Sequence, residues 1–212
     1  MLLCCRYPDL GTGALPGATT GQLRQLRLEP HVPDMLRSGL LSECFATSAR
    51  LRSLDGLGSP FRPASCWSLL SAHCGPAPGY AVFVKQGAAG LPLALRVYLG
   101  GHQVEFQPRG GSITITRDGQ QLDITDKSSE TFKVKKEEIF KLVRWGSVYT
   151  LFSNYNVNVI YDGTFVQVMP SPFVKGQHCG MCGNYDGVMK NDLLTKEGRA
   201  TTAANLPQDW CI

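Results

Sequence analysis

The stretch HCGMCGNYDGVMKND, residues 178–192, places a Cys-x-x-Cys pair directly before a run rich in Asn, Asp and Gly. Three kinds of site use such residues: a redox pair, a zinc site, and a disulfide beside a calcium loop. A redox pair of the thioredoxin kind begins a helix, whose N-terminal dipole lowers the thiol pKa. Gly183 and Gly187 here would break a helix, so the redox interpretation is disfavoured.

A zinc site would need a second pair of ligands, which His73-Cys74 and His178-Cys179 could supply. Zinc knuckles usually show two matched pairs, whereas this chain has one Cys-x-x-Cys. The cysteine count favours structural disulfides and an oxidising compartment instead. The eight cysteines are Cys4, Cys5, Cys44, Cys66, Cys74, Cys179, Cys182 and Cys211.

Composition narrows the class of protein further. With 212 residues, 43% hydrophobic and 18% charged, the chain is long enough to bury a core. The net charge of +4 is scattered, and its densest cluster, residues 131–136, alternates lysines with apolar residues as an exposed strand face does. We therefore expect no nucleic-acid partner. The apolar run before Arg6 is too short for a signal peptide, and no segment predicts a membrane span.

Two regions differ in pattern along the chain. Residues 1–43 are rich in Gly, Pro, Leu and Arg, with one possible short helix at 21–28, and are predicted to be a poorly ordered extension or a fragment of an upstream region. From Cys44 onward, short β-rich runs follow one another. They cover residues 80–85, 93–100, 102–107, 112–116, 121–125, 131–135, 147–152 and 157–161.

Turn signals support a β fold independently. Asp118-Gly119 joins two of these runs, and Asp162-Gly163 joins residues 157–161 to the following TFVQVM. Asp-Gly supplies the positive φ angles that tight hairpins require. The predicted fold is mainly β: an antiparallel β-sandwich, stabilised by disulfides, with an irregular loop near the C-terminus.

That loop has the oxygen ligands that calcium prefers. Its candidate ligands are the side chains of Asn184, Asp186, Asn191 and Asp192 and the backbone carbonyl of Val188. The glycine and terminal Glu of an EF-hand are not at their places. An Asx-rich surface turn would use the same residue types, and the residues alone favour neither interpretation.

Taken together, several motifs resemble the von Willebrand factor type D domain. Cys44 is followed by SLDG at residues 53–56 and by CWSLLSAHC at 66–74, which leads into YAVFVK; CGMCGNYDGVMKND comes last. The resemblance covers residues 44–212, which we take as one domain. It departs from the family at Ser53, where Thr is usual, and at Leu54, where Phe is usual.

The resemblance implies specific roles for residues. Asp55 would join Asn184, Asp186, Val188, Asn191 and Asp192 around a structural Ca²⁺ ion. The implied disulfides are Cys44–Cys182, Cys66–Cys211 and Cys74–Cys179, leaving Cys4 and Cys5 outside the core. Some family members use this Cys-x-x-Cys in disulfide exchange, but two cysteines held in long-range bridges leave no thiolate to attack.

No catalytic constellation is visible, so no enzyme is predicted. The histidines share no spacing, and neither a nucleophile motif nor a phosphate loop accompanies them. The segments around YAVFVKQ and the YDG hairpin before CGMCG resemble the vitellogenin style of the domain, and the last cysteine near the chain end suggests a C-terminal module.

The resemblance therefore implies a secreted module of a larger lipoprotein, which transports lipid or acts as a nutrient reservoir. The other modules of that lipoprotein would be its partners, and lipid would bind through a region upstream. The alternative is a structural or adhesive extracellular protein, clotting-like or mucin-like, that assembles through disulfides.

Overall fold

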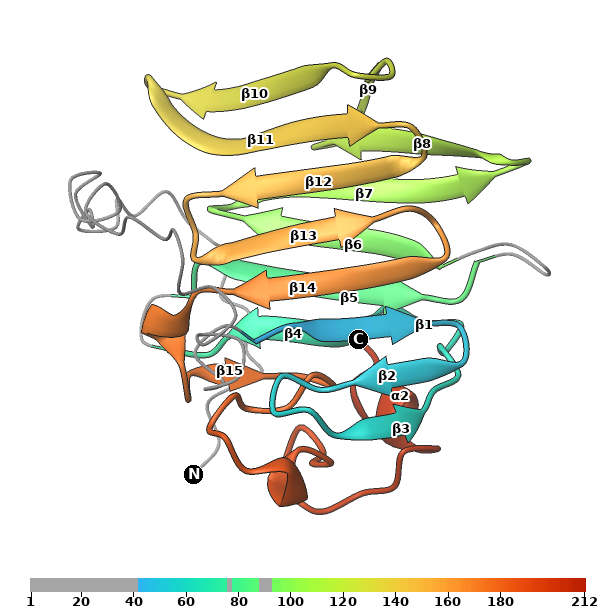
Figure 1. The fold of residues 1–212 in the computed structure, drawn as a ribbon, viewed down its shortest axis with the longest axis vertical. Coiled ribbons are helices and arrows are strands. Elements are labelled where there is room, and N and C mark those ends of the chain that lie inside the picture. The colour runs from blue at the N-terminus through green and yellow to red at the C-terminus, as the bar shows by residue number, and fades with distance from the viewer. Residues whose placement is uncertain (1–41, 76–77, 88–92) are drawn as a thin grey trace, which may run out of the picture.

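Two antiparallel sheets face each other in the computed structural model, which describes residues 42–75, 78–87 and 93–212 (Figure 1). One sheet has the strand order β10-β11-β12-β13-β14-β1-β2-β3, and the other β15-β4-β5-β6-β7-β8-β9. Buried residues from both sheets form one core between them. The predicted antiparallel β-sandwich is confirmed.

The strands are short, and most are joined by tight turns. Their bounds are β1 Cys44–Thr47, β2 Arg50–Arg52, β3 Gly58–Pro60, β4 Ser68–His73, β5 Tyr80–Lys85, β6 Ala94–Leu99, β7 His102–Arg109, β8 Ser112–Arg117, β9 Gln120–Leu122, β10 Ser129–Val134, β11 Glu137–Trp145, β12 Val148–Ser153, β13 Val157–Tyr161, β14 Phe165–Pro170 and β15 His178–Cys179. The 3₁₀ turns are η1 Pro172–Val174 and η2 Met189–Asn191, and helix α2 is Leu206–Asp209.

Period-two patterns in the sequence become buried and exposed faces of the strands. In β13, Val157, Val159 and Tyr161 are buried while the two residues between them are partly exposed. This alternation places one face on the core and the other toward solvent, as in a half-buried strand. Lys133 is exposed on β10, between Phe132 and Val134, which are partly buried.

The predicted strands all exist, but one is shorter than predicted, and the structure contains strands that were not predicted. The run at 121–125 contributes only β9, Gln120–Leu122, and then leaves the sheet. The longest strand, β11, was not predicted. Its sequence EEIFKLVRW buries Ile139, Phe140 and Leu142, so it lacks strict alternation; β11 also pairs with β10 across a bulge.

Both Asp-Gly hairpins are present, but they use their residues differently. Asp118 and Gly119 both have positive φ, 49° and 81°, which is the backbone of a type I′ turn. At the second hairpin only Gly163 has positive φ, 94°, while the Asp162 carboxylate accepts hydrogen bonds from Thr164 and Phe165. Asp162 therefore closes its turn through its side chain.

The predicted extension, residues 1–43, and its possible helix at 21–28 lie outside the described residues, except for Ser42 and Glu43. Within the described part of the chain, no helix is long and apolar enough to cross a membrane.

Candidate metal centre

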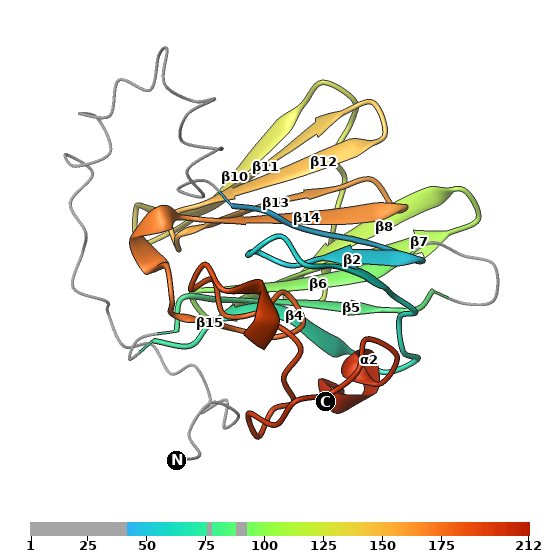
Figure 2. The same cartoon turned by 60° about the horizontal axis from the view of Figure 1, so that its bottom comes forward.

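Residues from both ends of the domain meet at one end of the sandwich, where the segment after β15 runs past β2, β3 and β4 (Figure 2). Three disulfides join distant segments there: Cys44–Cys182, Cys66–Cys211 and Cys74–Cys179, with sequence separations of 138, 145 and 105. These are the pairs that the family resemblance implies. The Cys179 and Cys182 sulfurs have different partners, so neither is a free thiol, and neither is available to zinc in this form.

Asp55 connects the early segment to the late loop. Its carboxylate oxygens accept hydrogen bonds from the backbone N–H of Gly187, at 2.8 Å, and of Asp186, at 3.1 Å. One residue earlier, the Leu54 N–H donates to the Cys182 carbonyl at 2.8 Å. The positive φ of Gly187, 93°, aims these loop N–H groups at the carboxylate. Asp55 and the loop are thus adjacent although 131 residues separate Asp55 from Asp186.

Asp186 lies at the surface and accepts hydrogen bonds from two side-chain amides. Its Oδ2 accepts from Asn184 Nδ2 at 2.9 Å and from Asn191 Nδ2 at 2.7 Å, and its Oδ1 accepts from the Val188 N–H at 2.7 Å. These hydrogen bonds, with that from Asn191 first, lower the pKa of Asp186, because they favour the ionised form.

Asp192 is the buried member of the cluster. Only 2% of its surface is exposed, and its Oδ2 accepts a hydrogen bond from Ser53 Oγ at 2.5 Å. Burial raises the pKa of Asp192 to about 6; the Ser53 hydrogen bond opposes this rise, and the charge of Asp55 adds to it. Gly183 makes room for the carboxylate, since a Cβ there would collide with Asp192 Oδ1.

Two buried oxygens in the cluster have no hydrogen-bond partner, Asn191 Oδ1 and Asp192 Oδ1. Acceptors left unpaired in the interior are costly, and a bound cation would satisfy both. They border a small cavity that also touches Asn184, Gly183 and His178. The donor set, carboxylates and amide oxygens on a loop, matches the preference of Ca²⁺.

Acidic side chains alone would not complete such a site. Within the described ranges, no three His, Cys, Asp or Glu residues are close enough to hold a metal ion together. Amide and backbone oxygens must therefore contribute. The Val188 carbonyl already accepts from the Asn191 N–H at 3.3 Å, but a carbonyl has a second lone pair for a ligand role.

The structure thus brings together five of the six sequence-predicted ligands through side-chain hydrogen bonds, with Val188 in the same turn. It adds Ser53, which the sequence marked only as a departure from the family. Ser53 also accepts from the Leu57 N–H at 2.9 Å, so one hydroxyl fixes the early turn and orients Asp192. The acidic residue it contacts lies 139 positions away, and no local signal could have shown this.

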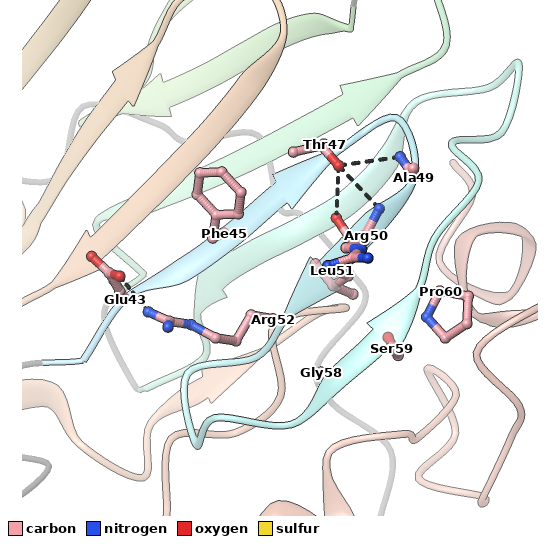
Figure 3. A pocket seen from close by; sticks show the side chains of 10 residues that line it. All are labelled: Glu43, Phe45, Thr47, Ala49, Arg50, Leu51, Arg52, Gly58, Ser59 and Pro60. Carbon is pink, nitrogen blue, oxygen red and sulfur yellow. Dashed lines mark hydrogen bonds and ion pairs between the residues drawn. The ribbon is translucent and has the colours of Figure 1, made fainter.

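A second surface feature is an open groove over β1, β2 and β3 (Figure 3). The Phe45 ring lies in it, stacked on Phe165 with centroids 5.3 Å apart, and Arg52 forms an ion pair with Glu43 at its edge. The groove contains none of the predicted ligands.

Comparisons with known proteins match the chain to one domain family. The model of the von Willebrand factor type D domain matches residues 54–199. Vitellogenin-6 of Oscheius tipulae is 22% identical over 186 residues, which cover 87% of this chain and 10% of that protein. The vitellogenin of Acipenser transmontanus is 23% identical over 177 residues, which cover 79% and 10%.

A relative of another kind matches as well. The human IgGFc-binding protein is 26% identical over 210 residues, which cover 94% of this chain and 4% of that protein. The chain therefore spans about a tenth of the vitellogenins it matches and less of the IgGFc-binding protein.

Proposed function

Because the chain belongs to the von Willebrand factor type D domain family, we propose that it is a non-catalytic, calcium-binding module of a secreted vitellogenin-like protein. The observation that carries calcium binding is the pair of buried, unpaired oxygens on Asn191 and Asp192, beside the carboxylate of Asp55. Calcium would neutralise carboxylates that repel one another and supply the missing partner for both oxygens.

In this role calcium is structural. Asp55, Asn184, Asp186, Asn191, Asp192 and the Val188 carbonyl would hold it, and Ser53 would orient Asp192. The ion would join the segment after β2 to the loop after β15, adding to the Cys44–Cys182 disulfide. Its binding energy would then contribute to the stability of the folded domain.

Thermal unfolding in calcium and in chelator tests this site. At a calcium concentration 100 times the Kd, we expect about 2.7 kcal/mol of stabilisation, a rise in Tm of about 5–10 °C. The double variant Asp186→Ala, Asp192→Ala should melt at the same temperature in both conditions. Asp118→Ala, at a hairpin turn away from the cluster, should keep the calcium shift. Equal Tm values for the unaltered protein in calcium and chelator would refute the proposal.

Lipid transport and nutrient storage would be properties of the whole lipoprotein. The vitellogenin matches support this parent, and the three disulfides support an extracellular location. A second candidate is an extracellular adhesive or binding protein, favoured by the match of the human IgGFc-binding protein over 94% of the chain. The complete transcript distinguishes them: a lipid-transport module upstream supports the first, and further type D modules support the second.

A further inference from the structure

Two histidines lie opposite each other where β15 pairs with β4. In the antiparallel register His178 is the partner of His73, and Cys179 is the partner of Ala72. Directly opposed residues of an antiparallel pair project from the same face, and the two imidazole rings have centroids 6.4 Å apart with planes at 42°. The Cys74–Cys179 disulfide links the same two strands and so fixes the distance between the rings.

His178 is buried without satisfying its polar atoms. Only 5% of it is exposed, and neither Nδ1 nor Nε2 makes a hydrogen bond of good geometry, the Val174 carbonyl being close but poorly aligned. The rings of Tyr80 and Tyr185 pack against it, with centroids at 6.1 and 5.5 Å. Burial, and then the proximity of His73, lower the pKa of His178 to about 4, with the nearby Val174 carbonyl opposing this, so the ring is neutral at neutral pH.

His73 is the more open member of the pair. Its Nε2 lies 3.1 Å from Gln177 Oε1, and both atoms occupy space that a side chain at Gly75 would fill, since a Cβ there would be 2.7 Å from each. His73 is thus partly exposed to solvent, while the His178 ring is held in the interior.

We propose that His73 and His178 form a two-imidazole site for a divalent transition-metal ion of the Cu²⁺ or Zn²⁺ class. Imidazole nitrogen suits these ions and not calcium, which takes oxygen ligands. Metal–nitrogen bonds of about 2.0–2.1 Å, with the radii of two rings, span about 5–6.5 Å between ring centres. The observed 6.4 Å lies at the long end of that range, where the two nitrogens are trans to each other as in tetragonal Cu²⁺, and water and the Gln177 amide oxygen complete the coordination.

The two-histidine site differs from the zinc site considered from the sequence, which would have used cysteine ligands. Cys74 and Cys179 are joined in a disulfide, and each directly follows one of the two histidines in sequence, Cys179 within β15 and Cys74 just after β4. Successive residues of extended chain point to opposite faces, so the cysteines lie on the other face from the histidines. His178 borders the same cavity as Asn191 and Asp192, but the calcium centre uses only oxygen ligands, whereas this site uses ring nitrogens. The proposal stands whether or not calcium binds there.

The test measures Cu²⁺ binding to the disulfide-bonded chain in buffer saturated with calcium, which keeps the oxygen site filled. Calorimetry gives the affinity, and electron paramagnetic resonance reports the nitrogen ligands. We expect one Cu²⁺ ion with two imidazole nitrogens, displaced by excess Zn²⁺. His73→Gln should weaken binding at least tenfold, and His178→Phe, which keeps an aromatic ring among the tyrosines, should do the same.

Two other histidines provide matched controls. His102→Gln removes a ring at the start of β7 whose Nδ1 lies 2.9 Å from Asp118 Oδ2, and His31→Gln removes the histidine outside the described residues. Both should bind Cu²⁺ as the unaltered chain does. A loss of less than tenfold in His73→Gln, one nitrogen ligand only, or loss in either control overturns the proposal. Because His73 is partly exposed, its variant decides the question even if His178→Phe does not fold.

Discussion

Two regions of the molecule are built from contacts of different range. One is the hairpin region, strands β10 to β14 at residues 129–170; the other is the disulfide-linked end, residues 42–57 with 178–192. In the hairpin region every strand pairs with its neighbour in sequence. At the disulfide-linked end, the Cys44–Cys182 bond, the Ser53–Asp192 hydrogen bond and the hydrogen bonds of the Asp55 carboxylate all join residues more than 130 positions apart. Strands β10 to β14 therefore form through pairing of sequence neighbours, whereas the candidate site depends on contacts between residues far apart in sequence.

Removing the Cys44–Cys182 bond should have the largest effect. Both cysteines are fully buried, and the bond closes a loop with a sequence separation of 138. In the chain-entropy model such a bond contributes about 4–5 kcal/mol. We expect Cys44→Ala with Cys182→Ala to lose about 4 kcal/mol of unfolding free energy in denaturant titrations, and to lose the calcium shift as well. A loss below about 1 kcal/mol would show that the end is held by other contacts.

Leu142→Ala should damage the hairpin region without affecting the site. Leu142 on β11 is fully buried, and truncating such a side chain costs about 2–5 kcal/mol through lost burial and the cavity left behind. We expect a loss of about 3 kcal/mol with the calcium shift unchanged. Phe152→Ala on the adjacent β12, where 45% of the ring surface is exposed, should cost less than about 1 kcal/mol. A calcium shift that disappears in Leu142→Ala would contradict the independence of the two regions.

The same contrast explains what the sequence could predict. The alternation in VNVIY and the Asp118-Gly119 turn are local signals, and each predicted its element correctly. Strand β11 was not predicted, because two consecutive residues, Ile139 and Phe140, are both buried and interrupt the alternation of apolar and polar residues. At the other end, local chemistry could only suggest an acidic loop. The pairing of cysteines and the approach of Asp55 required resemblance to a family, and the Ser53–Asp192 contact had no sequence signal at all.

Gly183→Ala should destabilise the protein more than Gly146→Ala, although both glycines have similar backbones. Gly183 and Gly146 both have positive φ, 82° and 62°, so alanine at either position costs about 1–2 kcal/mol of backbone strain. Only at Gly183 would the Cβ also meet Asp192 Oδ1; at Gly146, in the β11–β12 turn, the space is open. We therefore expect Gly183→Ala to be the less stable variant in chemical denaturation and to lose the calcium shift, while Gly146→Ala keeps it. Equal losses and equal calcium shifts would mean that the Asp192 carboxylate is free to move.

The smallest effect should be the pH dependence of stability in calcium-free buffer. The pKa of Asp192 is about 6 in the folded chain and 3.8 ordinarily, so between these values the folded state holds a proton that the unfolded state has released. Stability from this group is greatest below about pH 4 and falls as pH rises toward 6. His178 acts oppositely: its pKa is lowered from 6.5 to about 4, so the unfolded state binds the extra proton and stability rises with pH.

Comparison with Asp192→Asn separates these two contributions, because the amide does not titrate while His178 is unchanged. The stability of the unaltered chain relative to this variant should fall between pH 4 and 6.5, measured by denaturant titration in calcium-free buffer; a flat or rising difference would contradict the buried carboxyl. Saturating calcium should reverse the sign of the slope, since calcium binds the ionised carboxylate and competes with its proton. That reversal should be absent from Asp192→Asn, because the disulfide-linked end would have lost the carboxyl group that binds both the proton and calcium.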